Sequence, residues 1–249
     1  MRKSIDINCD LGEQEVFDPG FLHKILPYIS SANISCGAHA GTKEVIEGTI
    51  KLAKQYNIAI GAHPSYPDKE NFGRISAEMN QDDFRNMLKS QIDYFSALCK
   101  NASATITHIK PHGALYNDLA DNEELSMWFI DWISTNHPDI KIFGLAESIF
   151  EKIATAHGLD FVREGFMDRK YTSDLRLMSR KISGAVIKQT DQIIQQIDQL
   201  LNGKLIIESV ETPIQVDTIC IHGDTKGVEE KLEAIFNHLK NRGIEISAH

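Results

Sequence analysis

Cysteine and long apolar runs are both scarce in this sequence. Its 249 residues include only four cysteines, and no two of them form a CxxC pair, so a disulfide scaffold is not expected. No apolar run approaches the roughly 18 residues that a membrane-spanning helix needs. The first residues, MRKSIDINCDLG, include basic side chains but lack the apolar stretch of a signal peptide. We therefore expect a reduced, cytoplasmic protein with no membrane partner.

Positive charge is also in short supply. The chain has 26 Lys and Arg against 35 Asp and Glu, which gives a formal net charge of −9. A sequence-independent grip on nucleic acid needs clustered Lys and Arg, and no such cluster is found, so a nucleic-acid partner is not expected. Acidic ligands remain compatible with this charge, because one local cluster of cations can oppose the overall sign.

Glycine-rich nucleotide motifs are missing as well. Neither GxxxxGK[ST] nor GxGxxG occurs, and the GxSxG motif of α/β hydrolases is also absent. If the protein uses ATP, the phosphates must be held by another device or by another chain.

What the sequence does contain is a repeated alternation of short β-like runs with amphipathic helical segments. Apolar residues at helical spacing follow a Thr42 cap and an Asn80 cap, for example. The seven β-like runs are Ser4–Asp10, Ala32–Cys36, Ile58–Ala62, Ile106–Lys110, Ile140–Gly144, Leu159–Arg163 and Thr218–Ile221. Parallel strands need such helical crossovers, so the pattern predicts an α/β fold with a parallel sheet.

The number of units indicates how the sheet is closed. About seven β/α units favour a closed or nearly closed TIM-like barrel, with an open doubly wound sheet as the alternative. Residues 205–216 interrupt the repeat and predict an extra β-hairpin. No segment has the composition of a linker, so we expect a single domain over residues 1–249.

Ionisable side chains gather where the predicted strands end. Four of the ten histidines, His39, His63, His112 and His222, stand there beside small residues. In a parallel barrel the loops after all strands converge at one edge, so groups far apart in sequence can share a cleft there. These histidines are therefore candidates for a common site.

The strands themselves also carry polar residues. Asp6, Asn8 and Asp10 alternate with apolar neighbours, and His108 and Lys110 flank an isoleucine. Since alternate side chains of a strand point to opposite faces, this polar set is expected to line the barrel interior. Burying it costs several kcal/mol unless its members pair with one another or with a ligand, which predicts a polar, partly solvated pocket.

Two chemistries fit these residues. Asp10, His39 and His63 offer one carboxylate and two imidazoles, a ligand set suited to zinc or another divalent ion. Alternatively, Asp10 or His63 transfers protons without a metal, and Lys110 holds a carboxylate or phosphate. A purely structural Asp10–Lys110 ion pair across the barrel is the third interpretation.

At these same positions the sequence resembles the LamB/YcsF family, which includes the A subunit of the bacterial 5-oxoprolinase. The matching stretches follow the family's order and spacing over nearly the whole chain: IDINCDLGE, SSANISCGAHAG, IGAHPSYPD, HIKPHGALYN, EGFMDRKY and CIHGD. The chain departs from the family at Ile75, where a second Arg is usual, and at residues 174–176, which replace a DG-containing segment. These departures indicate a shifted loop or an altered substrate preference.

The resemblance implies an enzyme that opens the lactam of 5-oxoproline to give L-glutamate, driven by ATP, in a complex with two other subunits, B and C. It also implies similarity to the glycoside hydrolase/deacetylase barrels, in which an Asp and two His often bind a divalent metal; Asp10, His39 and His63 match those positions. The alternatives are a metal-dependent deacetylase or amidohydrolase that works without ATP, and a non-catalytic subunit that delivers the substrate.

The candidate residues fall into two further groups. The catalytic candidates are Asp10, His63, Lys110, His112, Asp168 and Arg169. The candidates for binding substrate or phosphate are Asn8, Asn33, Arg74, Glu164 and His222.

Overall fold

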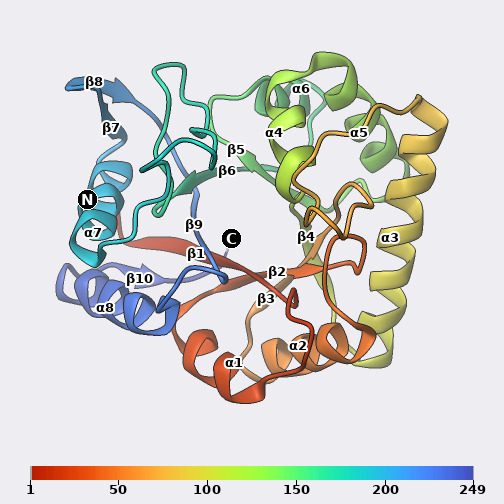
Figure 1. Ribbon diagram of the computed structural model, residues 1–249, viewed down its shortest axis with the longest axis horizontal. Helices are drawn as coiled ribbons and strands as arrows, with labels where there is room; N and C mark the ends of the chain where they lie inside the picture. Colours follow the sequence, from red (N-terminus) through yellow and green to blue (C-terminus); the bar gives the residue numbers. More distant parts are fainter. Residues whose placement is uncertain (1, 249) are drawn as a thin grey trace.

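Seven parallel strands close into a barrel in the computed structural model, which describes residues 2–248 (Figure 1). The barrel strands are β1 Ser4–Leu11, β2 Ser31–Ser35, β3 Ala59–His63, β4 Ile106–Ile109, β5 Lys141–Leu145, β6 Phe161–Phe166 and β9 Thr218–His222. Each pairs in parallel with the next, and β9 pairs with both β6 and β1, which completes the ring. The predicted seven-stranded α/β barrel is confirmed.

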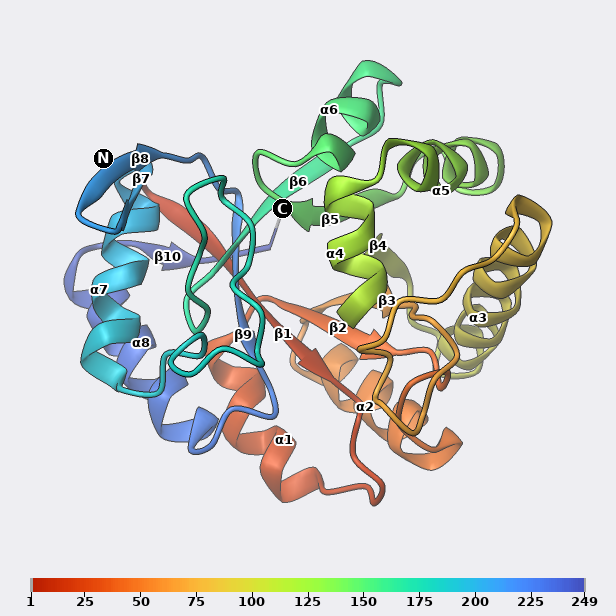
Figure 2. The same ribbon diagram turned by 45° about the horizontal axis from the view of Figure 1, so that its top comes forward.

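Helices surround the barrel on its outside (Figures 1 and 2). They are α1 Pro19–Ile25, the short 3-10 helix η1 Leu26–Tyr28, α2 Lys43–Gln55, α3 Gln81–Asn101, α4 Gly113–Asp121, α5 Glu123–Asn136, α6 Ile149–Ala156, α7 Thr190–Leu201 and α8 Val228–Asn241. The side chains of Thr42 and Asn80 accept hydrogen bonds from the first turns of α2 and α3, as expected of N-caps. Within residues 2–248, no helix combines the length and apolar character needed to cross a bilayer.

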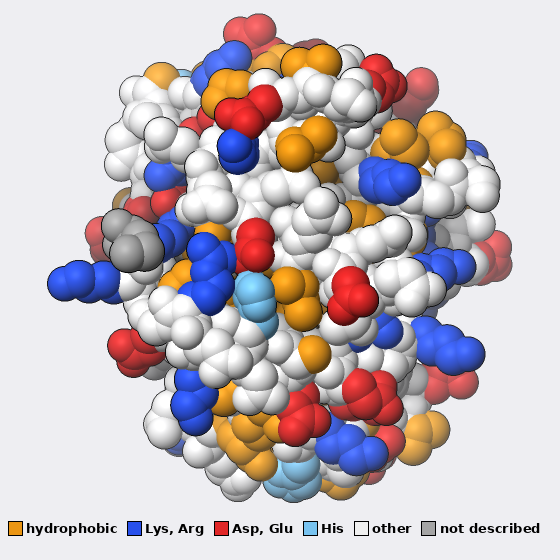
Figure 3. Space-filling model, turned by 90° about the vertical axis from the view of Figure 1, so that its left-hand side faces the viewer, with side chains coloured by type: hydrophobic (Ala, Val, Ile, Leu, Met, Phe, Trp, Pro, Cys, Tyr) orange, Lys and Arg blue, Asp and Glu red, His pale blue; other side chains and the backbone are white. Residues whose placement is uncertain are grey.

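Three strands lie outside the ring. The predicted hairpin is formed by β7 Lys204–Ile207 and β8 Val210–Pro213, which pair in antiparallel fashion. Together with α7 and α8 it covers the face seen in Figure 3, where charged side chains of both signs are interspersed. The third strand, β10 Glu245–Ile246, pairs with the first residues of β1. A strand of two residues is too short to show an alternation of polar and apolar side chains, so β10 could not be predicted from the sequence.

Polar side chains fill the barrel interior, as the alternation in β1 predicts. Asn33 donates hydrogen bonds of 2.7 Å to both Asn8 and Asp10, and the ring of His108 lies 2.8 Å from the Asn33 amide oxygen. His108 fits because its neighbour in register is Gly61, where a Cβ would lie 2.1 Å from the imidazole Nε2. These hydrogen bonds offset the cost of burying polar groups and fix the layer beneath the candidate site.

Candidate active site

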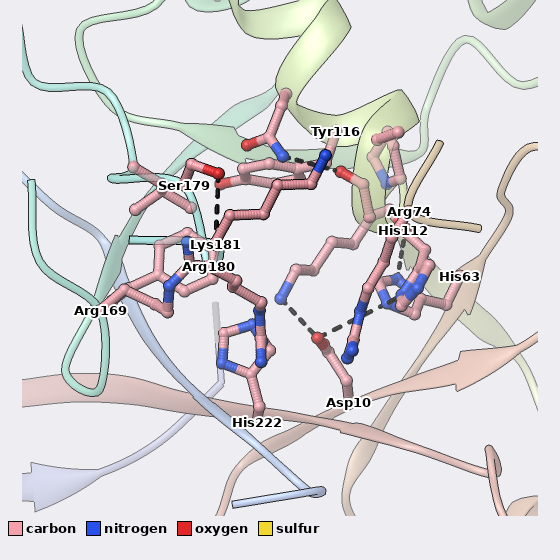
Figure 4. A pocket seen from close by; sticks show the side chains of 17 residues that line it. Asp10, His63, Arg74, His112, Tyr116, Arg169, Ser179, Arg180, Lys181 and His222 are labelled. Carbon is pink, nitrogen blue, oxygen red and sulfur yellow. Dashed lines mark hydrogen bonds and ion pairs between the residues drawn. The ribbon is translucent and has the colours of Figure 1, made fainter. Parts of the chain in front are cut away.

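A cavity of about 440 Å³ lies where the barrel strands end (Figure 4). Its wall combines side chains from strand ends with side chains from loops that are distant in sequence. Among the residues that line it are Asp10, His63, Arg74, Lys110, His112, Tyr116, Asn117, Phe166, Arg169, Ser179, Arg180, Lys181 and His222. Strand ends, α4 and the segment between β6 and α7 therefore contribute to one site.

The floor of the cavity is a buried cation between two carboxylates. The Nζ of Lys110 lies 2.9 Å from Asp10 Oδ1 and 2.9 Å from Glu164 Oε1. Burial alone would raise the pKa of Asp10, but Lys110 and His63 hold it well below its usual value. Burial likewise opposes the charge on Lys110, yet Asp10, Cys220 and Glu164 raise its pKa well above the ordinary range. The ammonium is thus charged at neutral pH and held in place by groups on several strands.

Two imidazoles meet beside this floor. The Nδ1 of His63 donates to the Lys110 carbonyl at 2.6 Å, and the Nε2 of His112 donates to the Phe72 carbonyl at 2.9 Å. Carbonyl oxygens only accept, so the N–H of each ring lies on its outer nitrogen. The inner nitrogens face each other at 3.0 Å, and Asp10 Oδ2 lies 3.6 Å from that of His63. Such a pair can share one proton or bind one cation.

The turn before α4 explains how His112 reaches this position. The backbone N–H of His112 donates to the Pro64 carbonyl, and that of Ala114 donates to the Gly73 carbonyl. Gly113 has φ +58°, and a Cβ there would lie 2.5 Å from the Gly73 oxygen. Glycine therefore permits the close approach of these two loops, which brings Arg74 to the cavity.

Glu13 joins the histidines although the sequence did not single it out. Its Oε1 lies 3.0 Å from Nε2 of His39 and 3.3 Å from Nδ1 of His112. Burial and the nearby Asp10 raise the pKa of Glu13 to about 7. Burial and His63 lower the pKa of His39 to about 2, and its ring stacks on His112 with centroids 3.7 Å apart. Its place in the sequence could have revealed it, because Glu13 follows the end of β1 just as the candidate histidines stand at the ends of other strands.

Two overlapping sets of side chains present metal-type donor atoms within 4.8 Å of one another among residues 2–248. They are Asp10–His63–His112 and Glu13–His39–His112. The expected ligands Asp10, His39 and His63 are divided between these sets, and His112 belongs to both. The outer N–H groups of His63 and His112 point to carbonyls, as is usual for metal-ligating histidines. The donor types suit a divalent ion, and metal binding remains a prediction.

His222 stands across the cavity from His63 and His112 (Figure 4), and its imidazole pairs with the carboxylate of Asp168. Buried Asp168 accepts hydrogen bonds from Nδ1 of His222 at 2.8 Å and from the hydroxyl of Thr225 at 3.0 Å. Burial would raise the pKa of Asp168, but His222 and Thr225 lower it overall. This carboxylate fixes the ring of His222, which lines the cavity, and leaves Nε2 as the nitrogen available to a ligand.

The remaining predicted residues divide between the cavity wall and the layer behind it. Arg74 and Arg169 lie in the wall; Arg74 is 2.9 Å from Asp224, and Arg169 donates to the Met178 carbonyl at 2.6 Å. The layer behind consists of Asn8, Asn33, His39, Glu164 and Asp168. Four of these hydrogen-bond to wall residues or to one another, whereas His39 hydrogen-bonds to Glu13 and Ser65 and stacks on His112 in the wall. The sequence did not single out Tyr116, Asn117, Ser179, Arg180 and Lys181, which lie in the wall.

Comparison with known proteins yields close relatives over the full length. The model of the LamB/YcsF family matches residues 5–249. The A subunit of 5-oxoprolinase from Staphylococcus aureus (strain MSSA476) is 37% identical over 247 residues, which cover 98% of this chain and 99% of that protein.

Solved structures agree with this relationship. The crystal structure of the lactam utilization protein from Thermus thermophilus has a TM-score of 0.90 at 30% identity, covering 99% of this chain and 100% of that one. A family 4 carbohydrate esterase from Streptomyces lividans, in complex with acetate, has a TM-score of 0.51 at 11% identity, with 99% and 92% covered. This second likeness shows the barrel fold alone.

Proposed function

Because the chain belongs to the LamB/YcsF family, we propose that it is the subunit in which the lactam of 5-oxoproline is opened to L-glutamate, with hydrolysis of ATP, in a complex with two other subunits. The observation that carries this proposal is the buried Asp10–Lys110–Glu164 floor beside the paired imidazoles of His63 and His112. The relative named as the A subunit of 5-oxoprolinase, which matches over nearly its whole length, supports the choice of substrate.

The charged groups of the cavity floor suit the attack of water on the lactam carbonyl, which is a weak electrophile. A lactam carbonyl resists water, and transfer of the γ-phosphoryl group of ATP to its oxygen would release ADP and create a better leaving group. Water then adds to the ring carbon, and its proton passes to Nε2 of His63; the carboxylate of Asp10, 3.6 Å away, stabilises the imidazolium that forms. The Lys110 ammonium stabilises negative charge that develops on oxygen at this point.

Ring opening requires a proton on the departing nitrogen. Without it, the tetrahedral intermediate can expel phosphate and return to the lactam, so that ATP is hydrolysed without product. His222 lines the wall opposite the His63–His112 pair and is oriented by Asp168. We assign this proton to the imidazolium form of His222, which keeps Nδ1–H on Asp168 and transfers the proton of Nε2 to the ring nitrogen as the C–N bond breaks. The γ-glutamyl phosphate that forms is then hydrolysed by a second water to glutamate and phosphate. Acid and base then act from opposite walls of one cavity.

The metal-type donor sets favour a second candidate function, a metal-dependent amidohydrolase that needs no ATP. In that case Asp10, His63 and His112 would hold a divalent ion. A bound ion would polarise the substrate carbonyl and lower the pKa of a coordinated water. The protein side chains would keep the roles of orienting the substrate and moving protons.

Release of glutamate from 5-oxoproline tests the proposal. We expect release that requires ATP and the partner subunits, and that falls by about 10²–10⁴-fold in Asp10→Asn and in Lys110→Ala. The matched control is Asp139→Asn, since Asp139 is exposed and remote in sequence from the site. Full activity in both cavity variants would make this chain a non-catalytic binding subunit. Turnover without ATP that a chelator abolishes would favour the metal-dependent hydrolase.

A further inference from the structure

The segment between β6 and α7 forms one wall of the cavity although it contains no helix and no strand of the barrel. Two isolated antiparallel bridges hold it, Arg169 to Val186 and Tyr171 to Leu177. Figure 2 shows it folded back in front of β9. It brings Arg169, Arg180 and Lys181 to the cavity, so several positive side chains arrive on one short piece of chain.

Arg169 is a buried cation that makes no close ion pair within residues 2–248, although the charge of nearby Asp168 favours its protonated form. Its side chain is 6% exposed, its Nη2 donates to the Met178 carbonyl, and its Nε is buried with no hydrogen-bond partner. The adjacent carboxylate of Asp168 is occupied by His222 and Thr225. Burial and Arg180 lower the pKa of Arg169 to about 10, so it is still charged at neutral pH. A buried charge without a direct ionic partner is costly, and an anionic ligand would reduce that cost.

The neighbouring cations are also poorly neutralised. Arg180 lies 4.0 Å from Asp224, and the same carboxylate already binds Arg74 at 2.9 Å. The cavity wall therefore holds Arg74, Arg169, Arg180 and Lys181, with Asp224 as the acidic partner of two of them.

We propose that Arg169, Arg180 and Lys181 form a subsite for the terminal phosphates of a nucleoside triphosphate. The three cations exceed the single charge of a carboxylate and match a polyphosphate, and guanidinium groups bind phosphate oxygens in a bidentate fashion. Tyr116, Asn117 and Lys110 line the same cavity, so a phosphate held here would share it with the lactam. This inference rests on the proposed function. It identifies three side chains that would hold the phosphates of ATP, a role that a glycine-rich loop has in other nucleotide-binding proteins.

Binding of tripolyphosphate to the full chain, measured by titration calorimetry, tests the subsite without turnover. We expect Arg180→Gln and Arg169→Gln each to weaken binding by about 10- to 100-fold, and to flatten its dependence on salt. Arg180 is partly exposed, so its variant should fold even if loss of buried Arg169 disturbs the segment. Lys188→Gln is the matched control, because Lys188 is exposed on the same segment outside this cavity wall.

Three outcomes would overturn the subsite: no binding of tripolyphosphate by the wild-type chain, unchanged affinity in Arg180→Gln and Arg169→Gln, or an equal loss in the Lys188→Gln control. Weaker binding of 5-oxoproline with unchanged binding of tripolyphosphate would assign the cations to the substrate carboxylate instead. Glutamate release is a separate measurement. The phosphate subsite can therefore be refuted while the proposed function is supported, and the proposed function can be refuted while the subsite is supported.

Discussion

Replacing Lys110 by methionine tests whether the cavity floor depends on a buried cation. The side chain keeps a similar length, but Asp10 and Glu164 lose the ammonium that lies 2.9 Å from each. Removing one partner of a buried ion pair leaves the other charge uncompensated, and such changes cost about 3–5 kcal/mol of stability. We expect Lys110→Met to lower the free energy of unfolding by this amount at about pH 8.

The loss should also depend on pH. In the wild type the pKa of Asp10 lies below its usual 3.8, so the ionised group contributes stability above that pH and loses it only as the pH falls through the lowered pKa. Without Lys110, burial raises the pKa of Asp10, and the folded state then favours the protonated carboxyl. The Lys110→Met variant should therefore recover stability, relative to the wild type, as the pH falls from about 8 to about 5.

Urea denaturation followed by tryptophan fluorescence measures both effects, since the chain has two tryptophans. The control is Lys51→Met on the exposed side of α2, which should change stability by less than about 0.5 kcal/mol. Adding Asp10→Asn and Glu164→Gln to Lys110→Met should restore part of the loss, because no unpaired charge then remains. A loss below about 1 kcal/mol at pH 8, or an equal loss at pH 5 and pH 8, would refute the reasoning.

Three further substitutions test other parts of the site. Gly61→Ala should lower the free energy of unfolding by about 1–3 kcal/mol in urea denaturation, because its Cβ would lie 2.1 Å from Nε2 of buried His108. Burial raises the pKa of Glu13 from 4.5 to about 7, so between these two values the folded state keeps a proton that the unfolded state has released. The wild type should therefore lose about 3 kcal/mol of stability, relative to the Glu13→Gln variant, as the pH rises from below 4.5 to above 7. Asp168→Asn should lower kcat for glutamate release by about 10²–10⁴-fold with little change in KM, because His222 loses the carboxylate that orients it.

Each of these substitutions has a counterpart elsewhere in the chain. Gly20→Ala in α1 would bring a Cβ to 3.2 Å from the side-chain oxygen of Asp18, which is exposed and can move, so it should cost less than Gly61→Ala. Equal costs at Gly20 and Gly61 would contradict the packing argument. Glu124→Gln, at an exposed position, is the control for Glu13→Gln and should change stability by less than about 0.5 kcal/mol. If Asp168→Asn changed KM alone, Asp168 and His222 would contribute to binding rather than to proton transfer.

The barrel could be predicted from the sequence because short β-like runs that end at glycine or polar residues alternate with amphipathic helical segments. The alternation in β1 likewise indicated an interior face, and the structure buries Asp6, Asn8 and Asp10 there. These features depend on local sequence and on the fixed period of a strand. Strand β10 gave no such signal, since it consists of Glu245 and Ile246 only.

The parts of the site that the sequence did not reveal depend on tertiary contacts. Glu13 meets His39 because the chain turns at Gly12, where φ is +75°. Arg180 reaches the cavity on a segment with no regular period, and the bridge from Arg169 to Val186 fixes its path. Neither contact follows from the spacing of residues, so both required the three-dimensional structure.

The position of 5-oxoproline in the assembled complex is the most direct test of the central claim. A structure of the complex with bound 5-oxoproline should place the lactam in this cavity, with its carbonyl group beside Lys110 and its ring nitrogen toward His222. The lactam bound elsewhere in the complex, far from Asp10 and Lys110, would contradict the account.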